Sequence, residues 1–113
     1  LRTGWQAKWI NPADYLGGSR VDGLHFPGFG LDATQVLLEG RGVAGLATDT
    51  AGVEPGTDTG FSVSRLALDS RLIVLENLTN LDQLPPTGAL LIIGLLRLEG
   101  GSGGPVSLTA LVP

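Results

Sequence analysis

The sequence contains no cysteine, no methionine and only one histidine among its 113 residues. Without cysteine, disulfides and thiolate metal sites are excluded, and we expect a cytoplasmic protein by default. One histidine cannot supply a catalytic zinc site, which takes about three protein ligands. Because the chain starts at Leu1 rather than at a methionine, we also expect a lost start or a piece of a longer protein.

Positive charge and long apolar runs are also scarce. The net charge is −4, and no basic run is present, which argues against a nucleic-acid partner. The longest apolar run, ALLIIGLL at 89–96, is far shorter than the roughly 20 residues of a membrane helix. The start shows no signal-peptide pattern, so we expect no membrane partner. With 42% hydrophobic and 16% charged residues, the chain is predicted to be one globular domain, 1–113.

Helix-like and strand-like segments alternate along the chain, which predicts an α/β layer structure. Apolar spacing and a glycine stop signal predict a helix over 31–41, and a second short helix is predicted over 61–69. Residues 1–30 have little periodicity and are interpreted as a long ordered loop with a possible short strand at its start. Strands are predicted at 43–50, 72–76, 88–100, with a possible bulge at Gly94, and 106–113.

Three polar positions are candidates for chemistry. Glu76 ends the apolar strand LIVL, where a carboxylate can bind a metal or act as a base, although capping or an arginine pair is the commoner role. His25, among aromatic residues, is more often a packed side chain than a ligand. Asp49-Thr50 closes the first strand and is either an active-site edge or a turn. The segment GGSGG at 100–104 precedes a strand rather than a helix, so no phosphate loop is predicted.

Five segments follow one another along nearly the whole chain: RTGW (2–5), HFPGFG (25–30), LLEGRGVAGLATDT (37–50), LENLTNLDQLPPTGA (75–89) and GGSGGPVSLTALVP (100–113). Together they resemble the C-terminal half of the cyclase-like metal-dependent hydrolases, which include bacterial kynurenine formamidases and isatin hydrolases. The resemblance implies a swivelling β/β/α fold with a mixed sheet, assembled as dimers or tetramers. It also implies hydrolysis of an amide, formamide, imide or ester bond with zinc or manganese.

The resemblance assigns roles to single positions. Glu76 matches the family's metal-ligand glutamate, but Ser64 stands where the family has a ligand histidine twelve residues earlier. The family's motif His-x-Gly-Thr-His-x-Asp, which supplies most of the ligands, is absent from this chain. Four further residues match positions around the family's pocket: Thr3, His25, Asp49 and Asn77.

We therefore expect a truncated homologue that is catalytically inactive as an isolated chain. It would bind no zinc or manganese alone and would retain a small-molecule pocket lined by Trp5, His25, Phe29 and Glu76. In the alternative, another chain or subunit carrying the histidine motif completes a metal-dependent hydrolase. In a third possibility, the sequence is a piece of a full-length enzyme.

The missing half has a structural consequence. It is expected to cover the sheet built by 72–76 and 88–100, so its absence would expose apolar surface and strand edges. The sequence therefore predicts a homo-oligomer that buries this surface.

Overall fold

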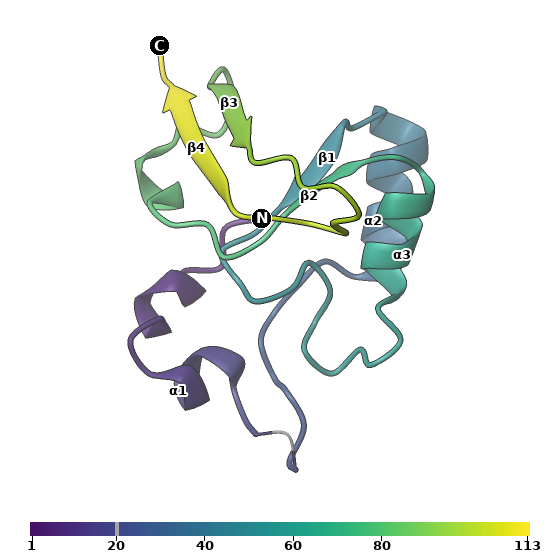
Figure 1. Ribbon diagram of the computed structural model, residues 1–113, viewed down its shortest axis with the longest axis vertical. Helices are drawn as coiled ribbons and strands as arrows, with labels where there is room; N and C mark the ends of the chain where they lie inside the picture. Colours follow the sequence, from purple (N-terminus) through teal and green to yellow (C-terminus); the bar gives the residue numbers. More distant parts are fainter. Residues whose placement is uncertain (20) are drawn as a thin grey trace. The chain divides into compact units, whose positions relative to one another are not determined.

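The computed structural model describes residues 1–19 and 21–113, and its contacts divide them into two compact units, Leu1–Leu81 and Asp82–Pro113 (Figure 1). Both helices and strands are present, so the predicted α/β class is confirmed. The assignment of 1–113 to one domain stays a prediction. Among the described residues, no helix is long and apolar enough to cross a membrane.

Among the described residues, the α-helices and a parallel pair of strands belong to the first unit. In chain order its elements are a 3₁₀ turn Trp5–Lys8, α1 Pro12–Leu16, α2 Leu31–Gln35 with its π-helical continuation Val36–Gly40, β1 Gly45–Ala47, α3 Ser62–Asp69 and β2 Ile73–Leu75. A second 3₁₀ turn, Leu81–Gln83, spans the boundary between the units. The predicted helices and strands are thus present, with shorter strands.

The prediction of a loop over 1–30 with a short strand at its start is wrong at two places, because Trp5–Lys8 forms a 3₁₀ turn and Pro12–Leu16 forms α1. Asn11 begins α1 because its side chain accepts a hydrogen bond from the N–H of Ala13, and Pro12 occupies the first turn. Gly17 ends the helix in the left-handed conformation, at φ 67°. This helix is only five residues long, so it has too few apolar positions to show a periodicity.

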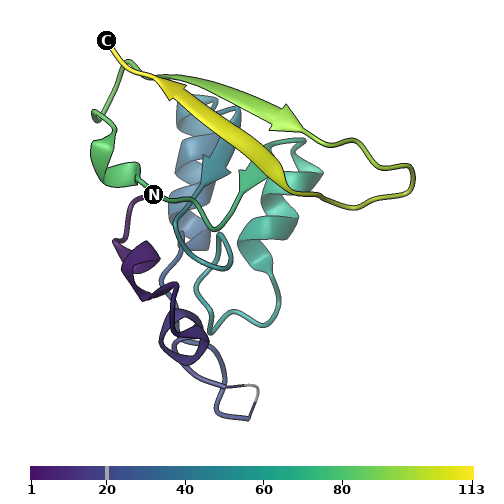
Figure 2. The same cartoon turned by 60° about the vertical axis from the view of Figure 1, so that its left-hand side comes forward.

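The core of the first unit lies where α2 and α3, side by side in Figures 1 and 2, pack against the two strands. Val63 and Ala67 are four residues apart on α3 and both face inward. They meet Leu46 of β1 and Val53 of the following loop. Partly buried apolar side chains surround this cluster: Phe29, Leu37, Val43, Leu72 and Val74.

The second unit is an antiparallel hairpin of β3, Leu90–Leu95, and β4, Val106–Leu111. The expectation that 72–76 and 88–100 build one mixed sheet is wrong, because β2 pairs only with β1 and β3 only with β4 among the described residues. The bulge at Gly94 is also absent, since Gly94 pairs in continuous register with Ser107. In a hairpin each strand finds its partner next to it in the chain, and β3 does so here.

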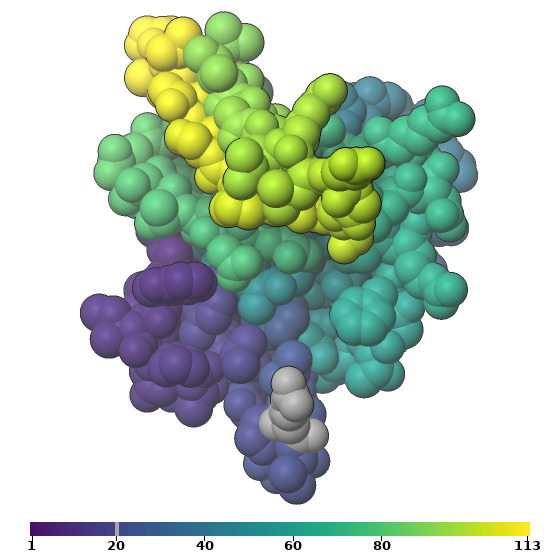
Figure 3. All heavy atoms as spheres, in the orientation of Figure 1, coloured from purple at the N-terminus to yellow at the C-terminus, as the bar shows by residue number. Residues whose placement is uncertain are grey.

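Apolar side chains lie on both faces of β3. Leu90 and Ile92 share one face of β3 and are 61% and 51% exposed, and Leu91 on the other face is also exposed. Figure 3 shows atoms of the hairpin, coloured green to yellow, at the surface of the molecule. A strand that is apolar on both faces is typical of one buried on both sides.

We expect Val63→Ala to lower the free energy of unfolding by about 2 kcal/mol, because it removes two buried methyl groups and leaves a cavity. Val63 is 1% exposed, whereas Leu68 on the same helix is 61% exposed. Leu68→Ala is therefore the matched control, with an expected change below about 0.5 kcal/mol. Urea denaturation followed by circular dichroism measures both, and equal losses would contradict the assignment of this core.

Candidate functional site

The candidate site lies at the carboxyl ends of β1 and β2. Because the two strands are parallel, their carboxyl ends meet at one edge, which is where ligands bind in open α/β sheets. The pairing continues past the strands: the N–H of Asn77 donates to the carbonyl of Thr50 at 2.9 Å, and the N–H of Leu78 to that of Thr48 at 3.0 Å. The structure therefore brings together the two strand-end pairs singled out in the sequence, Asp49-Thr50 and Glu76-Asn77.

Asp49 holds the start of the chain against this edge. Its side chain is 1% exposed and accepts three hydrogen bonds: from the N–H and the hydroxyl of Thr3, at 2.9 and 2.7 Å, and from the N–H of Gly4, at 2.7 Å. Burial raises the pKa of Asp49, but the hydrogen bonds from Thr3 and Gly4 outweigh it, so the pKa lies below its ordinary value. A carboxylate that accepts three hydrogen bonds and has a lowered pKa is a weak base at neutral pH.

Asn77 is held by Tyr15, a residue that the sequence analysis missed. The Tyr15 hydroxyl donates to Oδ1 of Asn77 at 2.8 Å and lies 3.2 Å from the carbonyl oxygen of Asp49. The pKa of Tyr15 is raised, first by burial and then by the negative charges of Asp49 and Glu76. The contact joins residues 62 positions apart, so no local pattern in the sequence could have predicted it.

Glu76 projects from the end of β2 and stays exposed. Its pKa is raised, first by partial burial and then by the negative charge of Glu54, while a backbone hydrogen bond from Val53 opposes the shift. Glu54 is buried, and its Oε2 accepts the N–H of Ser64 at 2.9 Å. Glu54 was not a candidate from the sequence, because it lies among the turn residues of 51–60, where a charged side chain ordinarily faces solvent.

Ser64 occupies the third position of α3, where backbone N–H groups have no partner within the helix. Glu54 accepts the N–H of Ser64, and Asp58 accepts the N–H and the hydroxyl of Ser62. These carboxylates cap the helix in place of Phe61, which supplies no side-chain cap. The hydrogen bond between Ser64 and Glu54 therefore uses the backbone of Ser64.

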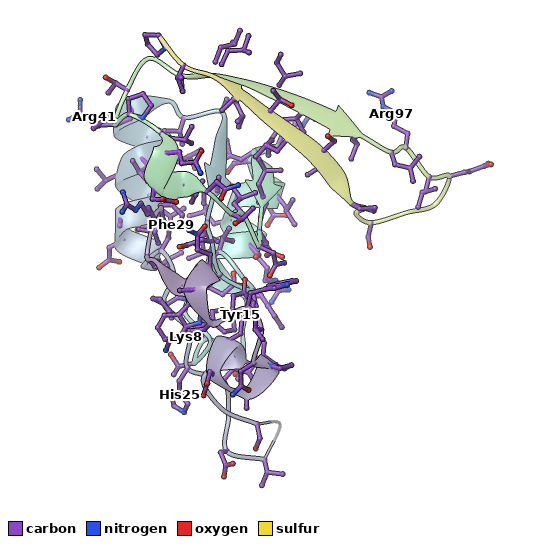
Figure 4. The ribbon with its side chains drawn as sticks, turned by 90° about the vertical axis from the view of Figure 1, so that its left-hand side faces the viewer. Lys8, Tyr15, His25, Phe29, Arg41 and Arg97 are labelled. Carbon is purple, nitrogen blue, oxygen red and sulfur yellow. The ribbon has the colours of Figure 1, made fainter. Side chains whose placement is uncertain are left out.

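Two further sequence candidates, His25 and Phe29, lie on the chain segment between α1 and α2. His25 is exposed on the loop after α1, where its N–H donates to the carbonyl of Leu16 at 3.0 Å. In Figure 4 it lies toward the lower end of the first unit, whereas Phe29 lies near α2 and belongs to the core. Among residues 1–19 and 21–113, no group of three or more His, Asp or Glu side chains could hold a metal ion.

A hollow of about 530 Å³ borders the turn that follows Glu76. It lies between the start of the chain and that turn, and its lining residues are Gln6, Ala7, Trp9, Ile10, Tyr15, Asn77, Leu78 and Thr79. None of the four residues predicted to line a pocket is among them, so the pocket of Trp5, His25, Phe29 and Glu76 stays a prediction.

Comparisons with known proteins agree with one another. The family model described as "Putative cyclase" matches residues 1–55. An isatin hydrolase of Roseibium aggregatum is 36% identical over all of this chain, which spans 44% of its length. Two solved structures, isatin hydrolase A from Ralstonia solanacearum and isatin hydrolase A from Labrenzia aggregata bound to benzyl benzoate, have TM-scores of 0.91 and 0.89 and identities of 34% and 36%. The chain is covered to 99% and 98%, and it spans 44% of each.

We expect Asp49→Asn to lower the free energy of unfolding by about 2 kcal/mol at pH 7, because hydrogen bonds to a charged acceptor are lost. The pKa of Asp49 is depressed in the folded state, so this stabilisation is present above the unfolded pKa of about 3.9 and is lost as the pH falls through the folded value. The difference between wild type and variant should therefore shrink below about pH 4.

Urea denaturation between about pH 3 and pH 7 tests this expectation. Asp69→Asn is the control, because Asp69 is exposed in the last turn of α3, and it should change stability by less than about 0.5 kcal/mol. A pH-independent loss in Asp49→Asn would contradict the charge-based role.

Proposed function

We propose, because this chain belongs to the cyclase-like hydrolase family, that it carries the glutamate side of a hydrolase site and is catalytically inactive on its own. One observation carries the proposal: Glu76 stands at the carboxyl edge of the parallel strands, beside the negative charge of Glu54. Ser64 stands at the position where the family resemblance places a ligand histidine, and the chain's one histidine, His25, lies on the loop after α1.

The residues at this edge fit a divalent cation in part. The negative charge of Glu54 raises the pKa of Glu76, and a cation would relieve the repulsion between the two carboxylates. Glu76 would be the residue that holds zinc or manganese. When bound, such an ion polarises a carbonyl group and makes hydroxide available near neutral pH. One exposed carboxylate is short of the roughly three protein ligands of a catalytic zinc site.

A second candidate function is a metal-dependent amide hydrolase completed by another chain or subunit. It is favoured by the strand-end arrangement, in which Glu76 and Asn77 lie beside the residues that follow β1. The relatives are named isatin hydrolases, and this chain spans 44% of the length of the curated one. A partner with the His-x-Gly-Thr-His-x-Asp motif would supply the missing imidazoles. The substrates to try are then isatin, a cyclic amide, and N-formyl aromatic amides, the formamidase substrates.

Metal content tests both candidates. Chain 1–113, incubated with Zn²⁺ or Mn²⁺ and desalted, should retain far less than one ion per chain and hydrolyse neither isatin nor an N-formyl aromatic amide. Retention of about one ion per chain would contradict the first candidate, the inactive chain, if the ion is lost in Glu76→Gln and kept in Glu39→Gln. The same result would favour the second candidate. Glu39 is exposed in the π-helical turn, which makes it a matched control.

A variant that restores the family's histidine tests the same site. Ser64→His puts an imidazole at the family's ligand position, so zinc affinity should rise on the order of tenfold by calorimetry. The gain should disappear when Glu76→Gln is added. Arg65→His places an imidazole at the next, exposed position and should bring no comparable gain. An equal gain from Arg65→His would contradict a shared site for positions 64 and 76.

We also propose that the chain is cytoplasmic and self-associates through the β3–β4 hairpin. An isolated two-stranded hairpin is marginally stable, and this one exposes apolar side chains on both faces. Sizing with light scattering at micromolar concentration should give a dimer or larger species, and Ile92→Asp should shift it toward monomer. Leu68→Asp, on the exposed side of α3, is the control and should leave the mass unchanged. A monomeric wild type would contradict this part of the proposal.

A further inference from the structure

We propose that Tyr15 is a positioning residue for Glu76: its hydroxyl holds Asn77, and Asn77 determines how the chain turns away from the glutamate. The functional meaning of this role rests on the proposed function, because it matters for chemistry only if Glu76 serves a hydrolase site. The geometry can be tested without metal or substrate.

The turn after Glu76 requires an uncommon backbone conformation. Asn77 has φ 58°, which lies in the left-handed region. Residues other than glycine are disfavoured there, and asparagine is among the best tolerated of them. Its N–H donates to Thr50, and the next N–H, of Leu78, donates to Thr48. These two bonds join the turn to the edge of β1, but they leave the Asn77 side chain free to rotate.

The Tyr15 hydroxyl removes that freedom. A phenol has one proton to donate, and the shorter of its two contacts is to Oδ1 of Asn77, at 2.8 Å against 3.2 Å for the carbonyl oxygen of Asp49. Tyr15 is buried whereas Asn77 is exposed, so the bond is partly shielded from water. Both ends of the Asn77 residue, backbone and amide, are then held.

Tyr15 is itself held firmly enough to act as an anchor. Its N–H donates to the carbonyl of Asn11 at 2.8 Å, and its carbonyl accepts the indole N–H of Trp5 at 2.5 Å. The Trp9 ring meets its ring edge-on, with centroids 5.1 Å apart. The start of the chain therefore sets the conformation of a turn that follows β2, more than sixty residues later.

Glu76 is the residue between β2 and this turn. Its backbone is constrained on one side by the pairing of Leu75 with Ala47 and on the other by Asn77. Loosening Asn77 would free the carboxylate from its place beside Glu54 and the Val53 backbone. The role of Tyr15 is thus exerted through Asn77, with no contact to a reacting group.

The test is amide hydrogen exchange by NMR on chain 1–113 carrying Tyr15→Phe, which keeps the ring and deletes the hydroxyl. We expect exchange at Asn77 and Leu78 to become about tenfold faster, as the loss of one local hydrogen bond predicts, with the Ile73 amide of β2 changed less than about twofold. The ¹³Cδ resonance of Glu76 should shift in the same variant. Trp9→Phe keeps an aromatic ring at the edge-on contact and leaves the hydroxyl in place, so it should reproduce neither effect.

Unchanged exchange at Asn77 and Leu78, or equal acceleration at Ile73, would overturn the proposal. Asn77→Gly provides an independent variant if Tyr15→Phe does not fold, because glycine tolerates the left-handed conformation but lacks the amide oxygen. It should shift the Glu76 resonance and speed exchange at Leu78, and failure to do so would also overturn the proposal. A failure of zinc binding in the Ser64→His variant, with these NMR effects present, would count against the proposed function alone.

Discussion

The parallel pairing of β1 with β2 is the constraint on which the first unit depends. Each strand has only three residues, yet the backbone hydrogen bonds continue past both ends, through Thr48, Thr50 and the turn at Asn77. Such a short pair is stable only when apolar side chains cover it, and the cluster around Leu46, Val63 and Ala67 supplies that cover. The polar edge of the sheet is then free to carry charged side chains that the core could not accept.

Three carboxylates near this edge differ in their burial and in their hydrogen-bond partners. Asp49 is buried and accepts three hydrogen bonds, which keep it charged and bind the start of the chain. Glu54 is buried and caps α3 through the N–H of Ser64. Glu76 alone remains exposed, with a pKa raised by partial burial and by Glu54. Only Glu76 therefore remains available to a ligand or an ion, which is why the proposed function is built on it.

The two units differ in how far their apolar residues are buried. The first is packed around a core and carries the candidate site, whereas the second is a hairpin whose apolar residues are largely exposed. The isatin hydrolases to which the chain is similar are more than twice as long, since it spans 44% of the curated one.

The sequence by itself determined the α/β class, the approximate places of α2, α3 and the four strands, and the position of Glu76 and Asp49 at strand ends, because apolar periodicity and turn residues are local signals. The resemblance to the cyclase-like hydrolases was likewise readable from five short motifs. Only the tertiary structure decided that β2 and β3 lie in separate sheets, that Glu54 is buried against α3, and that Tyr15 holds Asn77. Strand partners and hydrogen bonds between residues far apart in the chain depend on how the chain folds back on itself, and no local pattern encodes them.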